Sequence, residues 1–185
     1  MRWFLLITLL LLALLVYLLT PFISAGMNMQ EQPTVSLRAD GGSAKAGVRR
    51  LLQRYPAEKL KSGEISDVSL TVKELENVLR TAAIFASKQS RIGSEVTLLG
   101  EKVLVKMSVP MQGEFVNLRA EMSADEEGQL RTDFLQVGDD EWPTWMADMF
   151  LQQGLQKASG RSGMQLDRAR VEGKKLHFAV SPLDK

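Results

Sequence analysis

The spacing of apolar and polar residues changes several times along this chain, and each spacing predicts a different element. After Thr71, apolar residues recur at helical intervals, at Val72, Leu75, Val78, Leu79 and Ala82. Thr71 and Glu74 match a capping box, in which the threonine hydroxyl accepts from the N–H of Glu74 and the glutamate reaches back to the N–H of Thr71. The pattern predicts a helix over residues 72–87, preceded by a short extended segment at residues 65–70.

From Ser94 onward the apolar residues alternate with polar ones, which is typical of strands with one buried face. Glycine-containing turn sequences at residues 100–102 and 125–128 separate the runs. The alternation predicts an antiparallel meander of strands at residues 94–99, 103–110, 114–123 and 129–137. A last hairpin is predicted at residues 164–172 and 175–180, around the turn Glu172-Gly173-Lys174.

Two further stretches have helical patterns. Residues 43–55 carry apolar residues on one face and basic residues on the rest, and Pro56 ends this helix. In GDDEWPTWMADMF, residues 138–150, five large apolar residues share one helical stripe: Trp142, Trp145, Met146, Met149 and Phe150. We expect the acids at 139–141 to cap this second helix, and Gly154 with the KASGRSG stretch to end it.

The order of these elements predicts an α+β fold. It would be a curved antiparallel β-meander, forming one sheet, packed against one long helix and a second helix rich in Trp and Met.

The first residues predict a transmembrane helix. From Trp3 to Ile23 the chain has no charged residue, and about 20 apolar residues suffice to cross a bilayer. The alternative is a cleavable signal peptide, whose apolar core is usually shorter, about 7–15 residues, and whose cleavage site would not begin with the bulky Ile23. Arg2 and the α-amine favour a cytoplasmic N-terminus and an exported C-terminal domain. The chain then divides into an anchor (1–25), a polar tether (26–42) and a single α+β extracytoplasmic domain (43–185).

Composition narrows the classes of function. The chain has 23 basic and 22 acidic residues, which is not the basic balance of a nucleic-acid-binding protein. It has no cysteine, so the fold needs no disulfide and can hold neither a thiolate nucleophile nor a cysteine metal site. Its one histidine, His177, lies between Leu176 and Phe178 and is expected on the solvent face of its strand. GRSG at 160–163 is not a nucleophile elbow, and no cofactor or metal site is predicted.

Four segments resemble the YpmS-like family of membrane-anchored bacterial proteins: ISDVSLTVKELENVL, VLVKMSVPM, EFVNLRAEM and LQVGDDEWPTWMADMFL. The resemblance covers about residues 60–155. The residues at its motifs are Leu70, Thr71, Glu74, Leu75, Asn77, Pro110, Asn117, Gly138, Pro143 and Trp145. It implies a curved sheet around a long helix, loosely like tubular lipid-binding folds, without catalytic activity. From the apolar span and its flanking charges we expect a single-pass protein of the bacterial inner membrane with its domain in the periplasm.

Two groups of residues are candidates for binding. The apolar stripe formed by Trp142, Trp145, Met146, Met149 and Phe150 would either belong to the core or line an apolar groove for a lipid or a partner. The basic residues after the tether would form either a solvated helix face or a contact with anionic lipid headgroups. These are Lys45, Arg49, Arg50, Arg54, Lys59 and Lys61.

The sequence therefore favours a non-enzymatic, membrane-anchored envelope domain that binds an apolar ligand such as a lipid, or an envelope partner. The alternative is a structural subunit of an inner-membrane protein complex. An open cavity would favour the lipid-binding domain, and a core filled by side chains would favour the structural subunit.

Overall fold

The computed structural model describes residues 29–38, 41–87, 89, 91–162 and 164–182. The predicted anchor, Trp3–Ile23, lies outside these residues. Within the described part, no helix is both long and apolar enough to span a bilayer.

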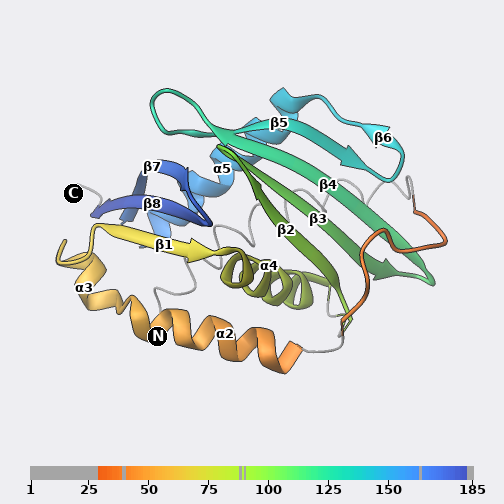
Figure 1. The fold of residues 1–185 in the computed structure, drawn as a ribbon, viewed down its shortest axis with the longest axis horizontal. Helices are drawn as coiled ribbons and strands as arrows, with labels where there is room; N and C mark the ends of the chain where they lie inside the picture. Colours follow the sequence, from red (N-terminus) through yellow and green to blue (C-terminus); the bar gives the residue numbers. More distant parts are fainter. Residues whose placement is uncertain (1–28, 39–40, 88, 90, 163, 183–185) are drawn as a thin grey trace.

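The described chain is an α+β fold with two antiparallel sheets (Figure 1). The large sheet has the strand order β2-β3-β4-β5-β6, formed by β2 (Gly93–Leu99), β3 (Lys102–Met111), β4 (Glu114–Ala124), β5 (Leu130–Val137) and β6 (Asp140–Glu141). The small sheet has the order β1-β8-β7, formed by β1 (Asp67–Thr71), β7 (Met164–Glu172) and β8 (Lys175–Pro182). The helices are α2 (Gly41–Arg54), α3 (Ala57–Lys61), α4 (Val72–Ser87) and α5 (Thr144–Ser162).

The predicted meander is confirmed by the pairing of β2, β3, β4 and β5 in sequence order. The prediction of one sheet is wrong, because β1 pairs with β8 and thereby builds a second sheet with β7. This pairing joins Asp67 to Ala179, residues far apart in sequence. Local alternation shows that a segment is a strand but carries no information about so distant a partner.

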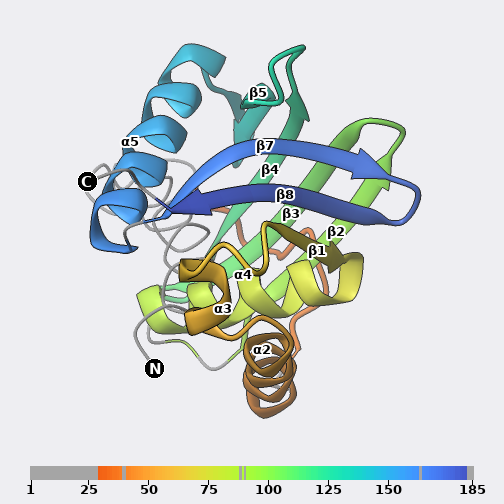
Figure 2. The same cartoon turned by 90° about the vertical axis from the view of Figure 1, so that its left-hand side faces the viewer.

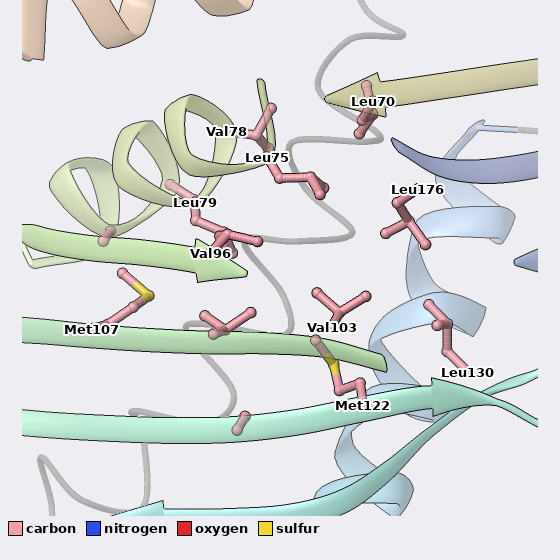
Figure 3. Close-up of a cluster of buried hydrophobic side chains, with 14 of the residues drawn as sticks. Leu70, Leu75, Val78, Leu79, Val96, Val103, Met107, Met122, Leu130 and Leu176 are labelled. Carbon is pink, nitrogen blue, oxygen red and sulfur yellow. The ribbon is translucent and has the colours of Figure 1, made fainter. Parts of the chain in front are cut away.

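Helix α4 packs between the two sheets and α2. Figure 2 shows α2 stacked on α4, and α4 in turn against the large sheet. In Figure 3, Leu75 and Leu79 of α4 point toward Val96, Val103 and Met107 of the large sheet. From the small sheet, Leu70 and Leu176 reach the same cluster. Full burial of a side chain of this size is worth about 1.5–3 kcal/mol, so this cluster is the main source of stability.

The start of α4 is the predicted capping box. The Glu74 carboxylate accepts from the backbone N–H of Thr71 (2.8 Å), and the Thr71 hydroxyl accepts from the N–H of Glu74 (3.3 Å). Arg54, at the end of α2, makes an ion pair with Glu74 at 2.9 Å. The cap therefore also ties α2 to α4.

Helix α5 is longer than predicted. We expected it to end near Gly154, but it continues to Ser162. A glycine inside a helix costs about 1 kcal/mol relative to alanine. Because α5 packs against β5 of the large sheet and β7 of the small one, tertiary packing outweighs this local cost.

We expect Thr71→Ala to lower the free energy of unfolding by about 1 kcal/mol, the usual cost of losing an N-cap side chain. Thr71→Ser keeps the oxygen and is the matched control, which should unfold like the wild type. Urea unfolding of the full chain in mild detergent measures both. Equal losses in the two variants would refute the capping role.

Stability should also depend on pH through Glu74. Burial raises the pKa of this carboxyl, but hydrogen bonds from Thr71 and the nearby Arg54 outweigh it and hold the pKa below its ordinary value. A lowered folded-state pKa gives stabilisation that is present above the unfolded value of about 4.3 and lost as the pH falls through the folded value. Glu74→Gln cannot titrate. Its urea midpoint should fall less steeply than that of the wild type between neutral and acidic pH, and parallel curves would contradict this assignment.

Candidate functional site

Residues 29–38 are docked against the large sheet. The sequence predicts residues 26–42 as a polar tether, and for residues 29–38 this needs correction. Gln30 exchanges two backbone hydrogen bonds with Phe115 of β4, at 2.9 and 2.8 Å. Arg38 forms a bridge with Ile92, just before β2. Figure 1 shows this docked segment running along one end of the sheet.

A buried polar pair holds the docked segment. Ser108 and Asn117 face each other on β3 and β4 and are 0% and 4% exposed, although they point to the face of the sheet away from α4. The Asn117 carbonyl oxygen accepts from the N–H of Thr34 (3.1 Å), and its amide donates to the carbonyl of Gln32 (2.9 Å). Ser108 accepts from the N–H of Val35 (3.1 Å). Two side chains of the sheet thus satisfy backbone groups of the segment.

Gly93 of β2 allows the docked segment to lie this close to the large sheet. A Cβ atom at Gly93 of β2 would lie 2.5 Å from the carbonyl oxygen of Val35. Real Cβ atoms do not approach an oxygen so closely, and a backbone carbonyl cannot move aside without moving the segment. The docked segment therefore depends on the absence of a side chain at Gly93.

The docked segment also contacts the acidic turn before α5. The Gln30 amide donates to the Asp139 carboxylate at 2.7 Å, and the N–H of Gly138 donates to the carbonyl of Asn117 at 2.8 Å. The prediction that the acids cap α5 is wrong. Asp140 and Glu141 form β6, paired with β5, and α5 begins only at Thr144.

The apolar stripe of α5 is not the core face. Trp145 is 65% exposed and Met149 is 41% exposed, whereas Ala147 and Leu151 are each 2% exposed. Asp148 is on the sheet side as well, where it accepts from the N–H of Thr132 at 2.6 Å. The interpretation of the stripe as core is therefore wrong for Trp145 and Met149.

The spacing alone did not identify the buried face. Trp142 precedes α5 and packs partly buried against the core, with its backbone N–H donating to the Leu135 carbonyl. Within α5, Ala147 and Leu151 are also four residues apart, and this second face is the buried one. Met146 is half-buried, and the side chain of Phe150 lies outside what the structure describes.

The predicted basic residues lie on α2 and α3. Arg54 and Lys59 are engaged with Glu74 and Glu64, at 2.9 and 2.6 Å. The other described members of the group are exposed on α2: Lys45, Arg49 and Arg50. The Lys61 side chain is not described. In Figure 2, α2 and α5 are on different sides of the domain, so the basic and apolar candidates form no common surface.

His177 is more enclosed than predicted. It does face away from Leu176 and Phe178, but its side chain is only 19% exposed. Asp67 and Glu172 flank its two ring nitrogens, each at 3.7 Å. Ser69 lies opposite it on β1, yet the Ser69 hydroxyl is 3.3 Å from the hydroxyl of Tyr55. The ring nitrogen Nε2 faces Glu172, so this arrangement is not a Ser-His-Asp triad.

The hollow between the β2–β3, β4–β5 and β7–β8 hairpins has no room for a water molecule. Its lining includes Val103, Leu130, Val171 and Leu176. Among the described residues, no three histidine or acidic side chains come together as a metal site.

Comparisons with protein-family models, with curated proteins and with solved structures gave no match. The resemblance to the YpmS-like family stays a prediction.

We expect Gly93→Ala to displace the docked segment and to cost about 1–3 kcal/mol, the usual range for an over-packed site. Trypsin should then cut after Arg38 faster than in the wild type. Gly42→Ala is the matched control, because a Cβ there meets nothing within 4 Å. Wild-type cleavage and stability in Gly93→Ala would mean that the segment does not need this close approach.

Proposed function

We propose that this chain is a non-enzymatic, membrane-anchored envelope domain that binds a protein partner. The observation that carries the proposal is the docked segment. Residues 24–28 alone separate the predicted anchor from the first described residue, Met29. An extended residue spans at most about 3.6 Å, so the domain would be held close to the bilayer surface. A domain fixed in this way is suited to present one surface to another membrane protein.

Two acidic side chains that could carry chemistry have structural partners, which favours binding over catalysis. Glu74 belongs to the cap of α4, and Asp139 accepts from Gln30. His177 is flanked by two carboxylates, neither of which comes within hydrogen-bonding distance of it.

The described core favours a protein partner over a lipid held inside the domain. Side chains of α4 and of both sheets meet in one buried cluster (Figure 3), and the described hollow between the three hairpins has no room for a water molecule. Lipid carriers need an open apolar cavity, typically of several hundred Å³. Binding would therefore occur on the surface, as in the alternative role of a subunit in an inner-membrane complex.

One face of the large sheet is a candidate for such a surface. Beyond the docked segment, the strands present charged and apolar side chains on the side away from α4, at Lys106, Arg119, Glu121, Leu104 and Phe134. The Arg119 guanidinium lies 5.3 Å from the centre of the Phe134 ring and 2.7 Å from Glu121. Aromatic and arginine side chains are enriched in protein interfaces.

A photo-crosslinking amino acid in place of Lys106 tests the proposal in living cells. We expect one crosslinked band of defined mass containing this chain and a second protein. The same amino acid in place of Lys174, in the β7–β8 turn, is the matched control and should give no such band. Crosslinking to lipid alone at Lys106, or no crosslink at any position of this face, would contradict a protein partner there.

A further inference from the structure

Two exposed apolar side chains lie together on α5. The large apolar residues that are exposed in the described part of the chain are Leu99, Trp145 and Met149. Trp145 and Met149 are four residues apart on one helix, so their side chains share a face. Leu99 is in the β2–β3 hairpin, which Figure 2 shows on the opposite side of the molecule from α5.

This face is connected to the predicted anchor by a limited length of chain. The docked segment begins beside Asp139, through the 2.7 Å hydrogen bond from Gln30. From Ile23 to Gln30 the chain can span at most about 25 Å, and from Asp139 to Trp145 at most about 21 Å. The predicted anchor thus limits how far Trp145 can be from the bilayer surface.

The chemistry of the two residues fits the bilayer interface. Tryptophan prefers the headgroup level, where its ring is half in an apolar and half in a polar environment, and methionine adapts to irregular apolar surroundings. The neighbouring exposed residues Asp139, Asp140 and Glu141 are acidic. Anionic lipid would be repelled there, so the contact would depend on apolar insertion and not on charge. The exposed basic residues of α2 are on another side of the domain (Figure 2).

We propose that Trp145 and Met149 insert into the interface of the same bilayer that holds the anchor. This inference rests on the membrane anchoring in the proposed function. The docked segment would then be one attachment of the domain to the membrane and α5 a second, which together fix its orientation.

The test uses the full chain in phosphatidylcholine vesicles with brominated acyl chains, which quench tryptophan at the bilayer. The chain has three tryptophans, so Trp3→Phe with Trp142→Phe leaves Trp145 as the reporter. We expect its emission to fall at least about twofold relative to vesicles without bromine, as for an interfacial tryptophan. Raising NaCl from about 0.1 to about 1 M shortens the Debye length from about 10 to about 3 Å and should leave the quenching unchanged.

Two further variants separate the outcomes. With Trp142→Phe and Trp145→Phe, Trp3 is the reporter of the anchor. If Trp3 is not quenched, the anchor and the proposed function fail together. In the second variant all three tryptophans are replaced by phenylalanine and Leu99→Trp is added. The new tryptophan at position 99 is exposed and lies away from α5, so it should remain unquenched.

If Trp3 is quenched but Trp145 behaves like the Leu99→Trp control, the inference is overturned while the anchor stands. Shielding of Trp145 from both brominated lipid and aqueous acrylamide would also overturn it, because a second copy of the chain would then cover this face. Quenching of Trp145 that disappears at high salt would refute apolar insertion as its cause.

Discussion

Burial of helix α4 is the interaction on which the rest of this fold depends. Val78, Ala82 and Ala83 are all 0% exposed, because α2, the large sheet and the small sheet cover the helix from different directions. Even Arg80 is 2% exposed and donates to the Ser94 hydroxyl of β2, at 3.2 Å. Helix α4 contacts both sheets, as α5 does, so a loss of its packing would weaken the junction between them.

The docked segment depends on a different kind of interaction, a small set of buried hydrogen bonds. Ser108 and Asn117 would ordinarily face water at their positions in β3 and β4. Buried polar groups are costly unless they are paired, and here the backbone of residues 32–35 supplies the partners. The same bonds that satisfy the two side chains fix the place of residues 32–35 on the large sheet.

How far the sequence could predict this structure follows from how local each signal is. The helix at 72–87 was predicted with its observed bounds, because a capping box and a clear apolar period lie within it. The strands of the meander were predicted to within a residue or two, because the alternation of apolar and polar residues also lies within each strand. The pairing of β1 with β8 and the course of α5 past Gly154 were not, since both are set by contacts between distant segments.

The candidate site shows the same limit. Nothing in residues 29–38 has a period, and Ser108 and Asn117 look like ordinary solvent-facing positions of alternating strands. Gly93 was the available signal: a glycine at the start of a strand often marks the close approach of another backbone. The helical period could not show whether Trp145 faces the core or solvent, because Ala147 and Leu151 form a second apolar face on the same helix, and that face is the buried one.

The docking of residues 29–38 has a consequence for the order of folding. This segment leaves the ribosome well before its partners, because Gln30 and Asp139 are 109 residues apart. Ends so far apart in sequence meet only at the entropic cost of closing the long loop between them. Residues 29–38 must therefore stay undocked until β2 to β5 have been made and have paired. A chain stalled before residue 139 would therefore lack the contact between Gln30 and Asp139 that helps to hold this segment.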